Sequence, residues 1–266
     1  MIFYLLLIYF FALGTCIGSF LNVVIYRLEQ EKNIYGFSYC PHCKHPLSWL
    51  DLVPVFSFIF LQGRCRYCSK KISLQYPLVE AITGIIFILA FIRGWPMVNP
   101  ASVLHLVFLW YIFSSLMVIF VFDLKHYIIP DVVLFPLIIT TIVYRIFEAV
   151  VWHMGPVQLA LNYGLAGGLA SAFFLVIFLV SAGRWMGFGD VKLAFFMGVL
   201  LGLQNVTVAL FLAFVLGAIV GLCLMVLKQK NIKSEIPFGP FLIVGSAIAL
   251  FSGQSIATWY LHLILL

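Results

Sequence analysis

Residues 103–122 read VLHLVFLWYIFSSLMVIFVF, an apolar run without a single Lys, Arg, Asp or Glu. An α-helix of about 20 residues rises about 30 Å, which is the thickness of the hydrocarbon core of a bilayer. The run therefore predicts a transmembrane helix, and Asp123 follows directly at its end.

Similar apolar runs recur along the chain, in which 64% of the residues are hydrophobic and only 9% are charged. This composition is typical of a polytopic membrane protein rather than a soluble domain. An eighth run, Leu193–Leu203, rises only about 17 Å, so it must be extended or must start below the membrane surface. We expect an all-α membrane helical bundle of about eight spans. The seven longer runs lie near Ile2–Ile25, Leu78–Ile92, Val103–Phe122, Val132–Val151, Leu159–Val180, Val206–Leu227 and Phe238–Leu265.

The basic residues predict the orientation, because short cytoplasmic loops carry the excess of Lys and Arg. Eight spans with the N-terminus outside leave only Arg93 and Arg145 on the outer side. The net charge of +6 is then explained by topology and anionic lipid, and no nucleic acid partner is expected. The cytoplasmic side receives Arg27, Lys32, Lys44, Arg64, Arg66, Lys70, Lys71, Lys125, Arg184, Lys192, Lys228, Lys230 and Lys233.

Pairs of glycines four residues apart suggest close packing between membrane helices. We interpret these glycines as packing residues without a catalytic role. The pairs are Gly14/Gly18, Gly164/Gly168, Gly198/Gly202 and Gly217/Gly221.

The only long hydrophilic stretch contains two CxxC pairs, Cys40/Cys43 and Cys65/Cys68. Each pair favours a tight turn that directs both thiolates at one tetrahedral ion, so the pattern predicts a structural Zn²⁺ site. Two disulfides are the alternative, which a reducing cytoplasm disfavours. His42 and His45 are alternative ligands, although four cysteines already complete the coordination shell.

Three aspartates lie where apolar runs meet short polar segments, which is a functional hypothesis by default. Asp123 ends a helix, where the helix dipole disfavours its ionised form, so its position favours function. Asp190 follows Gly187-Phe188-Gly189, and the alternative role is that of an N-cap. The flanking glycines let the backbone pass close to a partner, which favours function for Asp190 as well. For Asp131, after Pro130, helix capping is the favoured interpretation.

Two converging carboxylates can hydrolyse a peptide bond, because one deprotonates water while the other, protonated, polarises the carbonyl. The two helix dipoles suggest that Asp123 starts as the acid and Asp190 as the ionised base, although a coupled pair titrates as a unit.

Several motifs together resemble the type IV prepilin peptidases, also called leader peptidase/N-methyltransferases, which are membrane aspartyl proteases of the GxGD type. They occur in the family's order along almost the whole chain. They are GSFLNVVIYRL at 18–28, both CxxC pairs, YPLVE at 76–80, Asp123 through Ile129-Pro130-Asp131, GFGDVKL at 187–193 and PFGPF at 237–241.

The resemblance implies an enzyme of the bacterial cytoplasmic (inner) membrane whose active site faces the cytoplasm. It would cut the basic leader from type IV prepilins or pseudopilins and methylate the new N-terminus with S-adenosylmethionine. The family's catalytic aspartates fall on Asp123 and Asp190, and its cysteine cluster on Cys40, Cys43, Cys65 and Cys68. We expect a first span at 1–28, a cytoplasmic zinc loop at 29–76 and a peptidase core at 77–266.

Alternatives remain at this point. Glu80, Glu29 or Glu31 would pair with basic residues of the leader, or Glu80 would pair with Lys70 or Lys71. A peptidase without methyltransferase activity is the main competing enzyme. A transporter would need acids deep inside several spans and repeated halves, and a structural assembly protein with a zinc module would tolerate amides at both aspartates.

Overall fold

A computed structural model describes residues 2–33, 35–96, 99–227 and 236–265 of the chain. Three of the basic residues predicted to be cytoplasmic lie outside these ranges: Lys228, Lys230 and Lys233. Most of the described residues are helical, and their only β-type pairings are two isolated bridges. The chain forms two compact units, Met1–Val118 and Ile119–Leu266, which are described separately below.

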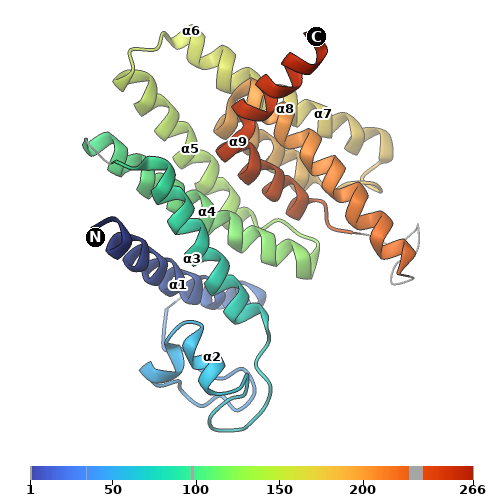
Figure 1. Cartoon of the computed structure of the whole chain (residues 1–266). Coiled ribbons are helices and arrows are strands. Elements are labelled where there is room, and N and C mark those ends of the chain that lie inside the picture. Colours follow the sequence, from blue (N-terminus) through green and yellow to red (C-terminus); the bar gives the residue numbers. More distant parts are fainter. Residues whose placement is uncertain (1, 34, 97–98, 228–235, 266) are drawn as a thin grey trace. The chain divides into compact units, whose positions relative to one another are not determined.

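The first unit pairs α1 (Ile2–Glu29) with α3 (Gln75–Gly94) and includes most of α4 (Pro100–His126) (Figure 1). Glycines permit the close approach of α1 and α3. A Cβ added at Gly14 would lie 2.8 Å from the Cα of Gly84, and one at Gly18 would lie 2.7 Å from the Cα of Glu80. The predicted packing role of Gly14 and Gly18 is therefore confirmed.

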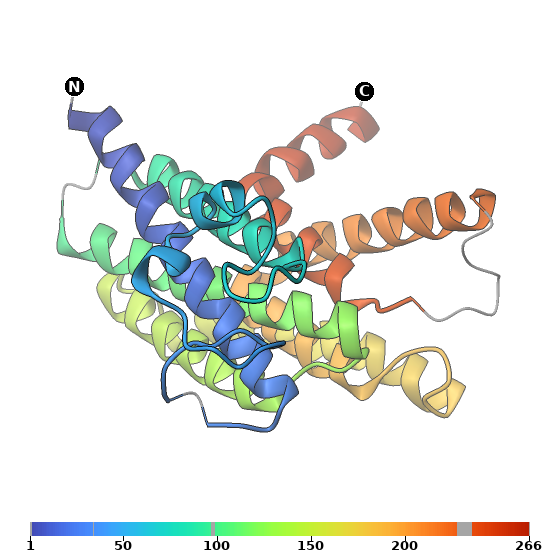
Figure 2. The ribbon, with the colours of Figure 1, turned by 90° about the horizontal axis from the view of Figure 1, so that it is seen from below.

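The loop between α1 and α3 carries a 3₁₀ helix, η1 (Trp49–Leu52), and a short helix, α2 (Phe56–Phe60). Figure 2, seen from below Figure 1, shows this loop in front of α1 and α3. Buried Arg27 fastens the loop to α1, because its guanidinium donates to the carbonyl oxygens of Gly36 at 2.7 Å and Phe37 at 3.2 Å.

The second unit begins with the last turns of α4 and continues through α5 (Asp131–Val151). The next segment is helical without interruption from Pro156 to Ser181, comprising α6 (Pro156–Leu159), a π-helical turn η2 (Ala160–Gly164) and α7 (Leu165–Ser181). The unit ends with α8 (Phe188–Val226) and α9 (Gly239–Leu265).

The long helix α8 consists of two helices that meet at Gly202, where φ is 74° and ψ is 174°. Phe188 contacts Phe178 of α7, and Gly198 abuts Ala166, so the first half runs antiparallel to α7. The second half runs parallel to α7, because the Leu203 amide lies at Asn162 and Phe214 stacks on Phe174. The chain therefore reverses direction at Gly202. The first half, Phe188–Leu201, corresponds to the predicted short eighth span.

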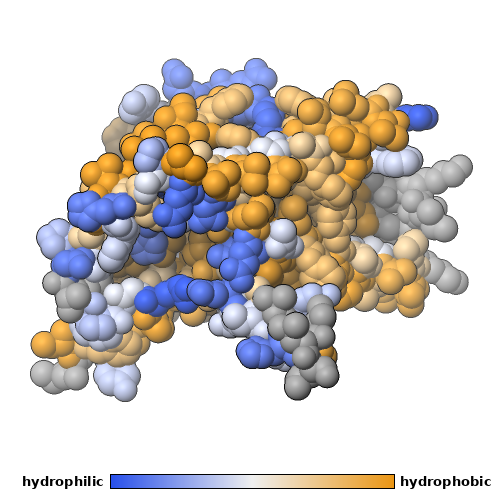
Figure 3. All heavy atoms as spheres, turned by 90° about the horizontal axis from the view of Figure 1, so that it is seen from above, coloured by the Kyte–Doolittle hydropathy of each residue, from blue (hydrophilic) through white to orange (hydrophobic). Residues whose placement is uncertain are grey.

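Among the described residues, seven helices are long and apolar enough to cross a membrane when α8 is taken as one of them. Divided at Gly202, α8 supplies two segments, which agrees with the expected bundle of about eight spans. Figure 3 shows apolar side chains over much of the face in view, with hydrophilic side chains gathered in patches. The chain is a multi-pass helical membrane protein by this composition and architecture.

Candidate active site and metal centre

Asp123 lies in the last turn of α4, and only 4% of its surface is exposed. The amide of Gly239, the first residue of α9, donates a hydrogen bond to the Asp123 carboxylate. The approach is so close that a Cβ at Gly239 would overlap the carboxylate Oδ2. Any side chain at position 239 would therefore displace the Asp123 carboxylate.

Asp190 is the third residue of α8 and is 8% exposed. The N-cap of this helix is Gly187, so the alternative interpretation of Asp190 itself as the N-cap is wrong. The side chain of Asp190 instead reaches back and accepts a hydrogen bond from the Gly187 amide, while its own amide donates to the Gly187 carbonyl at 3.2 Å. This exchange resembles a capping box, in which the third helical residue binds the N-cap amide.

The second unit brings the two aspartates together. The two carboxyl groups lie close enough for their charges to interact. Buried Ile129 fills the space beside them, since its side chain lies 3.1 Å from a Cβ added at Gly189 and 3.5 Å from one at Gly239. Ile129 therefore separates the chain segments at Gly189 and Gly239. Nothing within its Ile-Pro-Asp motif indicates this role.

Asp131 is the first residue of α5 rather than its cap, because the N-cap position is occupied by Pro130. The capping interpretation of Asp131 is therefore wrong. Its side chain is 51% exposed and forms an ion pair with Lys192 of α8. Asp131 thus lies outside the buried pair.

The structure also changes the argument from helix dipoles. Asp123 lies at the C-terminus of α4, as predicted, but the N-terminus of α9 also faces it through the Gly239 amide. A helix N-terminus favours a negative charge, which offsets the unfavourable end of α4. The dipoles therefore do not distinguish an acid from a base within this pair. Chemically, two adjacent buried carboxyl groups can share a proton and act together on one substrate atom.

The four cysteines of the loop gather at one point of the first unit. Their sulfur atoms all lie within 4.8 Å of one another, and the Sγ atoms of Cys40 and Cys68 are 4.0 Å apart. A tetrahedral Zn²⁺ with Zn–S bonds of about 2.3 Å needs sulfurs about 3.8 Å apart, so this donor set fits the ion. All four cysteines are free of disulfides.

The two CxxC turns repeat the same backbone pattern. The backbone amide of Cys40 donates to the His45 carbonyl at 3.0 Å, and the backbone amide of Cys65 donates to the Lys70 carbonyl at 2.9 Å. The residue after each second cysteine, Lys44 or Ser69, takes a positive φ of 58° or 57°. This geometry lets both thiols of each pair point the same way.

Neighbouring side chains join the two turns without entering the cysteine cluster. The ring of His45 stacks on Tyr67 at 3.7 Å, and His42 is likewise outside the set of converging ligand atoms. Asp51 accepts hydrogen bonds from the amide and hydroxyl of Ser48 and from the Tyr67 hydroxyl, and it pairs with Arg66 at 2.8 Å. Burial alone raises the pKa of Asp51, but these bonds outweigh it and hold the pKa below its usual range.

Glu80 is buried in α3 and accepts a hydrogen bond of 2.7 Å from the Val55 amide. This bond holds the start of α2, where Val55 has a positive φ of 62°. The predicted surface roles of Glu80, pairing with a leader or with Lys70 or Lys71, do not fit this burial. Sequence reasoning missed the internal bond because it joins segments far apart in the chain.

The fold and the two centres define a polytopic helical membrane protein with a buried aspartate pair and a cluster of four cysteines whose sulfur atoms could hold a metal ion. Residues 12–94 match the bacterial peptidase A24 N-terminal domain, and residues 110–222 match the type IV leader peptidase family. The chain belongs to the type IV leader peptidase family.

Relatives support this membership over nearly the full length. A prepilin leader peptidase/N-methyltransferase of Aeromonas salmonicida is 32% identical, covering 98% of this chain and 95% of that relative. Proteins of the same name from Legionella pneumophila and Bacillus subtilis are 30% and 29% identical, covering 93% and 96% of this chain and 92% and 98% of theirs. No solved structure matches the chain.

Proposed function

We propose that this protein cleaves the basic leader from type IV prepilins or pseudopilins and then N-methylates the new N-terminal residue. The observation that carries the cleavage proposal is the buried, adjacent pair Asp123 and Asp190, each bound to a backbone amide. The names of the full-length relatives support both activities.

In the proposed reaction, one carboxylate of the pair removes a proton from a water molecule. The water oxygen bonds to the carbonyl carbon of the scissile peptide, while the other carboxyl group, protonated, donates a hydrogen bond to the carbonyl oxygen. The C–N bond then breaks, and the departing nitrogen takes a proton from the pair. Because the aspartates are neighbours, their titration belongs to the pair and either can begin as the base.

We place both centres on the cytoplasmic face of the bacterial inner membrane. Lys125, Arg184 and Lys192 flank the ends of the helices that carry the aspartates, and short cytoplasmic loops are rich in such residues. A prepilin anchored by an apolar helix, with its basic leader outside the bilayer, would present its scissile bond at this level. Membrane lipid surrounds the spans, and no nucleic acid takes part.

Cys40, Cys43, Cys65 and Cys68 would hold one Zn²⁺, which would supply structural cross-linking of residues 29–76 rather than catalysis. S-adenosylmethionine would supply the methyl group, and we assign none of the described residues to it. In that transfer the S–CH₃ bond breaks, an N–CH₃ bond forms and the amine loses a proton.

The test is intact-mass spectrometry of a membrane-inserted prepilin after incubation with wild type, Asp123→Asn or Asp190→Asn. We expect cleavage and a methyl increment of mass with wild type, and loss of cleavage by at least about a thousandfold with either variant. Asp131→Asn is the matched control, because this acid lies on the same segment but outside the pair; it should cleave within a few-fold of wild type. Full cleavage by either dyad variant would refute the assignment.

A further inference from the structure

The reversal of α8 at Gly202 lies below the ends of the helices around it. Gly202 lies beside Asn162, and α6 begins at Pro156, about 9 Å further along the helix axis. On the other flank, α5 continues about 9 Å beyond Arg145, which reaches the same turn. Since the first half of α8 rises only about 20 Å, it ends short of a full membrane crossing of about 30 Å.

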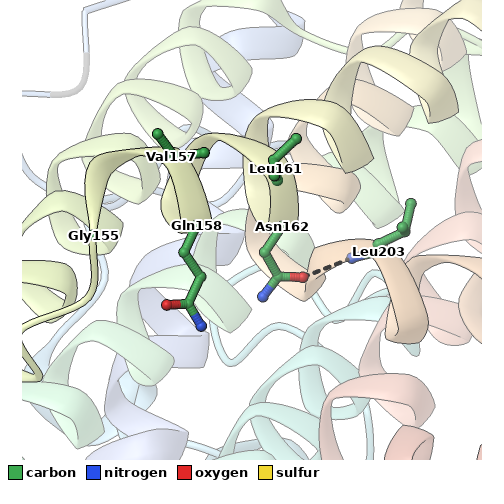
Figure 4. A pocket seen from close by; sticks show the side chains of 6 residues that line it. All are labelled: Gly155, Val157, Gln158, Leu161, Asn162 and Leu203. Carbon is green, nitrogen blue, oxygen red and sulfur yellow. Dashed lines mark hydrogen bonds between the residues drawn. The ribbon is translucent and has the colours of Figure 1, made fainter.

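A turn at this depth exposes backbone groups that the bilayer cannot satisfy, so protein groups must bind them. Arg145 donates through Nη2 to the carbonyl of Leu200, and Asn205 donates to the carbonyl of Leu201 at 3.4 Å. On the far side of the turn, the Leu203 amide donates to Asn162 at 3.4 Å (Figure 4).

Beside this turn lies an open surface pocket of about 540 Å³, and Figure 4 shows the residues that line it, Gly155, Val157, Gln158, Leu161, Asn162 and Leu203. The Asn162 side chain lines this pocket, and its Oδ1 accepts the hydrogen bond from the Leu203 amide. The bonds from Arg145 to Leu200 and from Leu203 to Asn162 hold the backbone on the two sides of the turn.

Arg145 is held from several sides. Its Nη1 pairs with Glu148, and the guanidinium lies 4.4 Å from the ring centroid of Tyr163. The side chains of Arg145 and Glu148 are only 15% and 18% exposed. A charged pair inside a span is costly, so a specific task is the first hypothesis. The guanidinium meets the carbonyl end of a helix, which is where a cation is favourable.

The helix that Arg145 caps carries Asp190 at its other end, about 15 Å away along a rigid segment. Sliding of that segment along its axis would move Asp190 against Asp123. The second link from α5 to this helix, Asp131–Lys192, is half exposed and constrains the helix weakly.

We propose that Arg145 is a positioning residue: by capping Leu200 it fixes the axial position of the first half of α8 and so aligns Asp190 with Asp123. This inference rests on the proposed cleavage reaction. Arg145 touches neither aspartate, so its effect is on the rate of the chemical step and not on prepilin binding.

The experiment compares the full-length variants Arg145→Met and Arg145→Lys, and the charge swap Arg145→Glu/Glu148→Arg, in lipid nanodiscs. We expect Arg145→Met to lower kcat at least about tenfold with KM unchanged, since small misplacements of catalytic groups cost this much or more. Arg145→Lys should recover much of kcat because its ammonium still donates to Leu200. The charge swap restores an ion pair, but the carboxylate at position 145 cannot donate a hydrogen bond to the Leu200 carbonyl. We therefore expect kcat to stay low.

A second readout does not depend on activity. Amide hydrogen exchange over residues 198–206 should speed up in Arg145→Met and in the swap, and stay near wild type in Arg145→Lys. Should Arg145→Met fail to fold, Asn162→Ala, which loosens the same turn from its other side, should still show faster exchange and lower kcat. Wild-type kcat in Arg145→Met, or its recovery by the swap, would overturn the proposal. Absence of cleavage by wild type would instead reject the proposed function. The hydrogen-exchange result would still test whether Arg145 caps the Leu200 carbonyl.

Discussion

The carboxylates of Asp123 and Asp190 each accept a hydrogen bond from a backbone amide. One of these amides is close to its aspartate in the sequence, and the other is far from it. Gly187 lies three residues before Asp190, whereas Gly239 lies more than a hundred residues after Asp123. The aspartates were predictable because each stands at the border of an apolar run. The Gly239 contact was not, because nothing within Pro237–Phe241 shows which side chain its amide will meet.

Gly239→Ala tests this contact, because the added methyl group would overlap the Asp123 carboxylate. We expect prepilin cleavage to fall by on the order of a hundredfold, the usual consequence of displacing a reacting group by about 1 Å. Initial rates measured by mass spectrometry check it. Gly168→Ala is the matched control, since a Cβ there meets nothing within 4 Å, and it should leave the rate unchanged. Equal rates in both variants would contradict the steric argument.

Asp51 allows a prediction about pH. Its folded pKa lies below the unfolded value of about 4, so its stabilising bonds are fully present above that pH and are lost as pH falls through the folded pKa. Asp51→Asn should therefore destabilise the loop by about 1 kcal/mol, equally at pH 6 and pH 8. Hydrogen exchange over residues 48–68 at both pH values measures this. A penalty that changes between them would show that another group is responsible.

For the helices and loops, the spacing of the cysteines and the lengths of the apolar runs predicted more than any helical periodicity did. The two CxxC pairs indicated one metal site, and the sulfur atoms do converge. The short run Leu193–Leu203 was recognised as an extra span, but Gly202 was interpreted as a packing residue. The positive φ there depends on the helices on both sides, which a glycine in an apolar run does not reveal. Arg145 was likewise expected in an outer loop, and its bond to Leu200 joins residues far apart in the chain.

Metal removal tests the cysteine centre. Wild type should contain about one Zn²⁺ per chain by elemental analysis, and Cys43→Ser should contain less than half of that. His42→Ala, a control in the same turn, should retain the full content because His42 is outside the cluster. Chelation should increase hydrogen exchange over residues 38–72. Full zinc content in Cys43→Ser would exclude the four-cysteine site.

At the scale of the whole molecule, the reversal in α8 decides the count of crossings. Composition and hydropathy were sufficient to predict a multi-pass all-α chain, and the described part of the chain contains seven helices long and apolar enough to span a membrane. Only the contacts of α8 with α7 show that its two halves run in opposite directions.

Reporter fusions test this topology. Reporters fused after Ser181 and after Leu227 should report the same, cytoplasmic side, because α8 leaves and returns between them. A reporter fused after Trp152 should report the outer side. Alkaline phosphatase and a fluorescent protein, active on opposite sides, serve as paired readouts. Opposite sides for Ser181 and Leu227 would mean that α8 crosses the membrane once.

The contact between Gly239 and Asp123 also orders events during synthesis. The ribosome makes both aspartates before it makes α9, so a nascent chain carries the two acids in the membrane without the amide that binds one of them. Both carboxylates of the proposed catalytic pair are bound by amides only when α9 has packed against the second half of α8. If the proposed pair is catalytic, a chain interrupted before this helix would hold both carboxyl groups but lack the amide that binds Asp123.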